Sequence, residues 1–202
     1  ISHAAQLLAE SEHIDGGDKR LLDIIEQHSK RMNGIVENVL SVSRRLPSYP
    51  EVLDLPEWLH RFRTDYLDSS AAQSRIELEL NTDSIEVRFD TQQLYQVVSN
   101  LVMNGLRYST KHDNIPHVRL VAGLQDSNQL PYLEVIDDGP GVPAALREHL
   151  FEPFYTTEAT GTGLGLYLSR EICEANLARL DYVAGNPGSC FRIIFAHPDR
   201  LH

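Results

Sequence analysis

Hydrophobic residues recur at alternating intervals of three and four positions between Lys19 and Leu46. This spacing places them along one stripe of a helix that packs in a bundle. The apolar segment from Ser2 to Ser11 predicts the end of a preceding helix, and Gly16 and Gly17 between the two allow the chain to reverse. The pattern therefore predicts a helical hairpin at residues 1–46. Because one hairpin leaves its stripe half covered, we expect two copies to form a four-helix dimer.

Two prolines, Pro47 and Pro50, interrupt the helical pattern and mark a linker at residues 47–50. Residues 51–202 mix short alternating strands with amphipathic helices, without a regular strand–helix–strand repeat. This mixture predicts an α+β sandwich with helices on one face of a mixed sheet. Asp90 and Gln93 have the spacing of a capping box that opens a long helix. The predicted helices are 56–70, 90–108 and 163–176, and the predicted strands are 75–80, 86–89, 118–124, 132–136, 180–184 and 190–195, the last two joined by a turn at 185–188.

The charge of the chain narrows its possible partners. A formal net charge of -11 argues against nucleic acid, which is bound through clustered Lys and Arg. Cys173 and Cys190 lack the spacing of a metal site, so we expect buried free thiols. No apolar stretch is long enough to span a bilayer, which predicts no direct membrane contact. Because the chain opens on Ile1 without Met, we expect a cytoplasmic fragment whose membrane anchor lies upstream.

The long predicted helix carries polar residues that suit a Mg²⁺-bound triphosphate. Asn100 and Asn104 are four positions apart and share a face, with Arg107 and Tyr108 one turn further on. Amide oxygens ligate a hard metal without adding charge that repels phosphates, and an arginine binds phosphate oxygens. Taken alone, paired asparagines are more often ordinary surface residues.

Two glycine-containing segments follow in the sequence. Asp137 comes directly after an apolar strand and precedes Gly139 and Gly141. An ionised aspartate there would accept from the exocyclic amine of adenine, although a simple Asp-Gly turn is an equal alternative. Residues 161–166 read Gly-Thr-Gly-Leu-Gly-Leu at the start of a helix, where free amides and the helix dipole bind phosphate. Three such segments in this order predict a nucleotide site.

These segments resemble the conserved boxes of sensor histidine kinases. Residues 90–109 resemble the N box of that family, residues 137–141 its first glycine box, Phe151 to Phe154 its F box, and residues 161–166 its second glycine box. The resemblance covers essentially the whole chain. It implies a Bergerat ATP-binding fold, with ATP and Mg²⁺ bound between the N-box helix and a mobile lid at about residues 142–162.

The resemblance also implies roles for individual residues. Asn104 would ligate Mg²⁺ with Asn100 assisting, Asp137 would hold adenine, and Phe151 and Phe154 would anchor the lid. The partners that it implies are ATP, a response regulator and a second copy of the chain. The implied ATP-binding residues are Asn100, Asn104, Arg107, Tyr108, Asp137, Gly139, Gly141, Phe154, Gly161, Thr162, Gly163, Leu164 and Gly165.

Within the family, residues 154–158 and 166–176 are most similar to the nitrogen-regulation and type IV pilus sensor kinases, and more to the latter. This similarity implies a response regulator that activates sigma-54-dependent transcription. Glu158 stands where relatives usually have lysine. Because a carboxylate would repel a triphosphate, we expect either that Glu158 points to solvent or that the lid is poorly ordered.

The histidine that would accept the phosphate is not evident. In the family an acid and an Arg-Asn-Pro-like stretch follow this histidine, whereas His3 is followed by Ala4 and Ala5. We therefore interpret His3 as a surface or bundle residue, and His28 as a core or interface residue. The resemblance places the phosphoacceptor about nine residues, or roughly 13 Å of helix, upstream of Ile1. We expect the chain to bind ATP-Mg without phosphorylating itself.

Two other functions are weighed against this one. ATP-hydrolysing clamps of the gyrase, mismatch-repair and Hsp90 type place a glutamate one turn before the metal-binding asparagine as a general base. Here that position is Gln96, which cannot accept a proton. The second alternative is a dimeric pseudokinase that only scaffolds, and the intact nucleotide segments oppose it.

Overall fold

The computed structural model describes residues 21, 22, 24, 25, 29, 48–69, 73–109, 115–158, 161–185 and 188–198. The chain divides into two compact units, residues 1–46 and 47–202. In the first unit the described residues are helical, as the periodicity predicts, and Leu22 and Ser29 are buried. The rest of the predicted hairpin, with His3 and His28, lies outside the described residues.

A mixed five-stranded sheet forms the second unit, in the order β2-β4-β5-β7-β6. Strand β2 pairs parallel with β4, and the other neighbours are antiparallel. A separate pair, β1 with β3, is antiparallel. The predicted strands are confirmed to within one residue at each end. The bounds are β1 Glu51–Asp54, β2 Arg75–Leu80, β3 Glu86–Phe89, β4 His117–Leu124, β5 Pro131–Ile136, β6 Arg179–Ala184 and β7 Ser189–Ile194.

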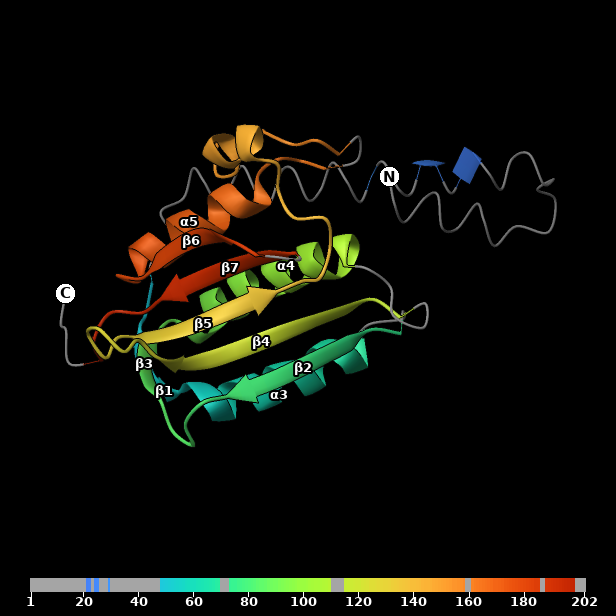
Figure 1. Cartoon of the computed structure of the whole chain (residues 1–202). Coiled ribbons are helices and arrows are strands. Elements are labelled where there is room, and N and C mark those ends of the chain that lie inside the picture. Colours follow the sequence, from blue (N-terminus) through green and yellow to red (C-terminus); the bar gives the residue numbers. More distant parts are fainter. Residues whose placement is uncertain are drawn as a thin grey trace. The chain divides into compact units, whose positions relative to one another are not determined.

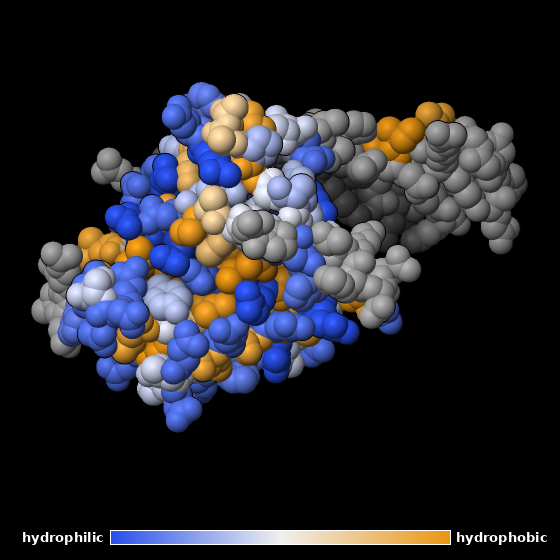
Figure 2. Space-filling view, viewed as in Figure 1, coloured by the Kyte–Doolittle hydropathy of each residue, from blue (hydrophilic) through white to orange (hydrophobic). Residues whose placement is uncertain are grey.

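The helices cover one face of this sheet, as predicted. Helix α3 (Leu55–Ser69) packs on β1 and β2, α4 (Thr91–Tyr108) packs on β4 and β5, and α5 (Gly165–Ala175) packs on β6 and α4. Figure 1 shows α3 and α4 behind the strands. Figure 2, from the same side, shows the other face as mainly hydrophilic with scattered hydrophobic residues. Among the described residues, no helix has the length and apolar content of a membrane span.

The hydrophobic core lies between the helices and the sheet. Alternate residues of β5, including Leu133 and Val135, point into it, while apolar positions of α4 such as Val98 and Leu101 close it from the other side. Burial of this stripe fixes the rotation of α4. Asn100 and Asn104 of the same helix lie outside this stripe and are half-buried.

The start of α4 differs from the predicted capping box. Asp90 Oδ1 accepts hydrogen bonds from the Gln92 and Gln93 amides, as an N-cap should. The reciprocal bond from the Gln93 side chain is absent, because Asn176 Oδ1 accepts the Asp90 N–H at 3.0 Å and Asn176 Nδ2 donates to Gln93 Oε1 at 2.6 Å. A residue 86 positions away therefore takes the place of the local partner.

Three other features correct or complete the sequence predictions. Helix α5 begins at Gly165 rather than Gly163, because Gly163 has φ +68°, outside helical geometry. Strand β1 and a 3₁₀ helix, η1 (Ala144–His149), were not predicted. Cys173 and Cys190 are buried free thiols, as expected. Burial raises the pKa of both thiols, that of Cys190 to about 12, which makes them poor nucleophiles.

Candidate nucleotide-binding site

Helices α4 and α5 bring the first and third predicted segments together. Asn100 Nδ2 on α4 donates to Ser169 Oγ on α5 at 3.0 Å. The Asn100 amide also lies against Gly165, where a Cβ atom would overlap Asn100 Oδ1. Glycine at this position therefore allows the first turn of α5 to approach the asparagine. The side-chain oxygen of Asn100 faces the helix N-terminus.

The N-terminus of α5 has the properties of a phosphate site. Its N-cap, Leu164, makes no side-chain hydrogen bond to the first turn, so the backbone amides there receive no side-chain cap. Thr162 Oγ1 accepts the Leu164 amide, at 3.4 Å. Backbone N–H groups and the positive end of the helix dipole favour an anion at such a position.

Metal binding would rest on the amides of α4. Asn100 and Asn104 are both half-buried and one turn apart, and Arg107 is exposed in the last turn. Among the described residues there is no group of three His, Cys, Asp or Glu side chains that could hold a metal ion. Two neutral amide oxygens beside a phosphate site fit a Mg²⁺ ion that takes its other ligands from phosphates and water.

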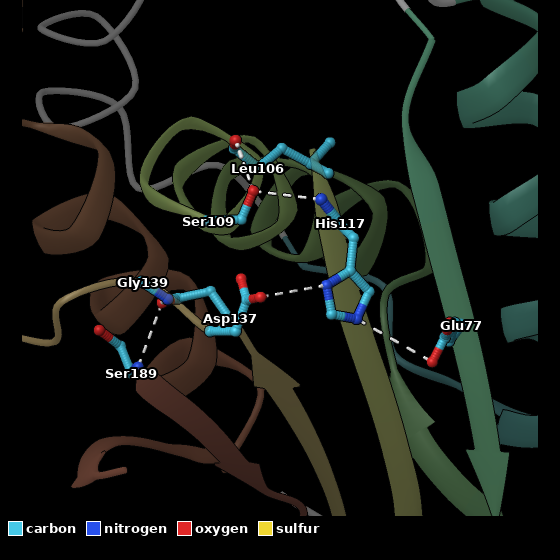
Figure 3. A network of polar contacts seen from close by, with 8 residues as sticks. Glu77, Leu106, Ser109, His117, Asp137, Gly139 and Ser189 are labelled. Carbon is cyan, nitrogen blue, oxygen red and sulfur yellow. Dashed lines mark hydrogen bonds and ion pairs between the residues drawn. The ribbon is translucent and has the colours of Figure 1, made fainter. Parts of the chain in front are cut away.

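The second segment places a buried carboxylate at the end of β5. Asp137 is 5% exposed, and its Oδ1 accepts hydrogen bonds from the Gly139 amide at 2.9 Å and the Ser189 amide at 3.2 Å (Figure 3). Burial raises the pKa of Asp137, and the accepted hydrogen bonds act in the opposite direction. Gly141 follows with φ +73°, close to the Gly188 carbonyl. The segment therefore forms a bent loop around one oriented carboxylate.

Close contacts with strand β4 and with the loop after β5 bring α4 up to this carboxylate. A Cβ atom at Gly105 would lie 2.6 Å from Val118 Cγ1 and 3.6 Å from Asp137 Cβ, so only glycine permits this separation. At the end of α4, Ser109 Oγ accepts the His117 amide at 3.1 Å (Figure 3). Gly139 lies against the Tyr108 carbonyl, where a Cβ would overlap it. All three predicted segments thus meet around the C-terminal half of α4.

A scan of the chain against protein-family models matches the histidine kinase-, DNA gyrase B- and HSP90-like ATPase family over residues 89–199. The sensor protein kinase PilS of Pseudomonas aeruginosa is 55% identical over 202 residues, which are 100% of this chain and 38% of that protein. The chain belongs to the sensor histidine kinases of two-component systems. The sensory histidine kinase/phosphatase NtrB of Rhodobacter capsulatus is 30% identical over 96% of this chain and 56% of that protein. The chain therefore spans less than two thirds of the curated relatives it matches.

Solved kinase structures support the same fold. Full-length ShkA, crystallised with AMPPNP, has a TM-score of 0.72 and 18% identity over 100% of this chain and 44% of that chain. ThkA in complex with the response regulator protein TrrA has a TM-score of 0.72 and 20% identity over 98% of this chain and 57% of that chain. Acinetobacter baumannii AdeS has a TM-score of 0.66 and 22% identity, covering 99% and 94%. The Bergerat fold of the histidine kinase family is confirmed.

Glu158, in the segment expected to form the lid, makes a contact that the kinase resemblance did not predict. Its side chain is half-buried, and Glu158 Oε1 accepts a hydrogen bond from Tyr108 Oη at 3.1 Å. Of the two alternatives expected for Glu158, a side chain that points freely to solvent does not describe this contact, and the other, a poorly ordered lid, stays a prediction. Burial raises the pKa of Tyr108, and the bond to Glu158 raises it further. The phenol remains a donor at neutral pH and ties the lid to the end of α4.

The two phenylalanines of the F box behave differently. Phe151 is buried against Phe191, with the Arg170 guanidinium 3.6 Å from its ring centroid, which is the packing expected of a residue that would anchor a lid. Phe154 is 67% exposed, and its ring makes no aromatic contact with the described residues, so the expected anchoring by this side chain is not observed there. Instead its backbone, at φ +66°, donates to the Gly163 carbonyl at 2.9 Å. Gly161 closes the same segment through its amide, which donates to the Glu158 carbonyl at 3.2 Å.

Sequence reasoning missed three residues that shape this candidate site. Gly105 was not predicted as a site residue, although a glycine inside a strong helical pattern is itself a sign of close packing. Ser169 and Ser189 gave no local signal, because they act on Asn100 and Asp137 across 69 and 52 positions.

Replacing Gly165 with alanine tests the closeness of α5 to Asn100. The added methyl is expected to push the Asn100 side chain aside while the fold is retained, because the atoms it meets belong to a side chain that can rotate. We expect ATP-Mg affinity to fall by about tenfold or more, since displaced metal-site groups have effects of this size. Nucleotide titration and thermal melting would measure both quantities.

Glu171→Ala is the matched control, because Glu171 is exposed on the same helix. It should change neither quantity by much. Wild-type affinity in Gly165→Ala would contradict the arrangement.

Proposed function

We propose that this chain binds ATP-Mg and transfers the γ-phosphate to a histidine, from which it passes to an aspartate of a response regulator. The observation that carries the proposal is the contact of Asn100 with the uncapped N-terminus of α5. This contact would set two amides that can ligate Mg²⁺ beside a site that can bind phosphate. Family membership and the buried carboxylate at Asp137 support it.

Different residues would bind the adenine, the phosphates and the metal ion of the nucleotide. Asp137 accepts from the adenine amine, and the amides of the first turn of α5 bind phosphate oxygens with Arg107. Asn100 and Asn104 hold Mg²⁺, which would neutralise charge on the phosphates when bound. Positioning and electrostatics of this kind supply most of the catalysis in phosphoryl transfer. The lid, tied down through Phe151 and Glu158, excludes water from the site.

We also propose partners and a setting for this reaction. The response regulator would be of the sigma-54-activating type, as the similarity to PilS and NtrB suggests. The solved complex of ThkA with TrrA is a precedent for such a partner in the fold. Two copies of the chain would pair through residues 1–46, and the module would act in the cytoplasm.

Supplying the acceptor separately tests this function. The 202-residue chain, incubated with γ-labelled ATP and Mg²⁺ and a family bundle that carries its histidine, should produce acid-labile phosphate on the bundle. The chain itself should acquire none, because His3 lacks the acid and the Arg-Asn-Pro-like stretch. Asn104→Ala should lower ATP-Mg affinity by about 10- to 100-fold, whereas Met103→Ala, exposed on the same helix, should not.

The outcomes separate the alternatives. Steady release of inorganic phosphate without transfer would favour an ATPase clamp, which Gln96 argues against because it cannot act as a base. Nucleotide binding with neither product would favour a scaffolding pseudokinase. Labelled His3 would show that the acceptor had been assigned wrongly.

A further inference from the structure

A buried asparagine joins the segment between the two linker prolines to both nucleotide-site helices. Asn176, at the C-cap of α5, is 3% exposed. Its Nδ2 donates to Gln93 Oε1 at 2.6 Å and to the Ile172 carbonyl at 2.9 Å. Its Oδ1 accepts from the Asp90 amide at 3.0 Å and from Ser48 Oγ at 2.8 Å. Only one of these four partners belongs to α5.

The segment before β1 is held at a second point. The Tyr49 amide donates to Asp90 Oδ2 at 2.9 Å, while Asp90 Oδ1 caps α4. Ser48 and Tyr49 therefore bind the end of α5 through Asn176 and the start of α4 through Asp90. Capping the C-terminus of α5 would not by itself require Asn176 to bond with the Ser48–Tyr49 segment and the start of α4.

The same two helices meet again at the nucleotide site. Because Asn176 contacts Gln93 and Ser169 contacts Asn100, α4 and α5 run antiparallel and are joined by polar side chains at two levels. Helix α5 has eleven residues, which correspond to about 16 Å. A helix this short moves as a rigid rod, so a shift at Asn176 changes the position of Gly165 relative to Asn100.

We propose that Asn176 is a positioning residue that couples the segment Ser48–Tyr49 to the nucleotide site. The proposal rests on the proposed binding of ATP-Mg. Attachment of the segment fixes α5 against α4 in the arrangement that binds phosphate. By thermodynamic reciprocity, bound nucleotide also stabilises the attachment of the segment. A change in the attachment of Ser48–Tyr49 therefore changes the affinity of the site for nucleotide.

Ser48→Ala tests the coupling in the 202-residue chain. It removes the hydrogen bond from Ser48 Oγ to Asn176 Oδ1. The other three hydrogen bonds of the Asn176 side chain remain, so the protein should fold. In the wild type, ATP-Mg should slow amide hydrogen exchange at Tyr49 about fivefold, at the low end of typical coupling. In Ser48→Ala this slowing should disappear, and ATP-Mg affinity should fall by about two- to tenfold, as expected for one hydrogen bond.

Thr91→Ala is the matched control. It removes the hydrogen bond from Thr91 Oγ1 to Glu51 Oε1, at 3.0 Å, which joins β1 to the start of α4 without involving α5. The control should keep both the nucleotide affinity and the nucleotide-dependent slowing at Tyr49.

Two results would overturn the proposal, in distinguishable ways. Should Ser48→Ala lower the melting temperature but retain the slowing and the affinity, Asn176 is only a structural cap. Should the wild type fail to bind ATP-Mg in direct titration, the proposed function fails and the coupling fails with it. Asn176→Ala, if it folds, should lose the slowing as Ser48→Ala does.

Discussion

Replacing Asp137 with asparagine is expected to remove tight ATP binding while leaving the unliganded protein at least as stable. An asparagine oxygen can still accept from the Gly139 and Ser189 amides. The charge is lost, however, and an amide N–H₂ would face the amine of adenine. A hydrogen bond to a charged group is worth about 1.5 to 3 kcal/mol, so ATP affinity should fall at least about tenfold.

The stability effect of this change should depend on pH in a defined direction. Because burial raises the pKa of Asp137 above 3.8, the folded protein holds the proton more tightly than the unfolded chain does. The ionised form therefore destabilises the fold at pH values above the raised pKa. Well below pH 3.8 the aspartate is protonated in both states and this penalty is absent.

Thermal melts of Asp137→Asn and wild type across pH, with ATP titrations at neutral pH, would measure both effects. The melting-temperature advantage of the variant should be largest near neutral pH and should shrink on acidification. Unchanged ATP affinity in the variant would show that Asp137 does not hold the base.

Replacing Gly188 with alanine is expected to destabilise the catalytic unit severely. Gly188 has φ +94°, and a Cβ atom there would overlap the Asp137 carbonyl. Strained backbone costs about 1 to 3 kcal/mol, and overpacking against atoms that cannot rotate away costs a similar amount. We therefore expect a loss of about 3 kcal/mol or more in the free energy of unfolding, measured by urea denaturation.

Gly123→Ala provides the comparison for this variant. A Cβ atom at Gly123 meets Tyr132 Oη at 2.8 Å and Asn81 Nδ2 at 3.0 Å, which are the ends of side chains that can move. Its loss should be about 1 kcal/mol, a typical value for a point substitution. Equal losses in the two variants would show that the backbone contact at Gly188 is not special. Any Gly188→Ala protein that folds should also bind ATP poorly, because Ser189 beside it donates to Asp137.

Local pattern predicted most of the elements but few of the contacts between them. The alternation in β5 and the stripe in α4 follow directly from which side chains must be buried, so their positions could be read from the sequence. Strand β1 was missed because Glu51 and Asp54, at its ends, are residues that strands disfavour. The 3₁₀ helix within the lid is too short to show a period.

The sequence predicted which segments form the candidate site, but not the contacts between them. The order of the segments and their resemblance to kinase boxes pointed to Asn100, Asp137 and Gly165, but their mutual contacts depend on how α4 and α5 pack. The bond of Tyr108 to Glu158 spans 50 positions, and no local pattern predicted it. The Asn176 contacts span up to 128 positions, and no local pattern encodes such pairings.

The order of the five strands also determines which strands are exposed to pairing with other molecules. The two outer strands, β2 and β6, could template pairing with another sheet, which is a route to aggregation. Both carry charge along their length: Arg75, Glu77 and Glu79 are exposed on β2, and Arg179 pairs with Asp181 at 2.6 Å on β6. Charged edges discourage strand addition between molecules. The charges on these two strands therefore act against pairing between the sheets of two molecules.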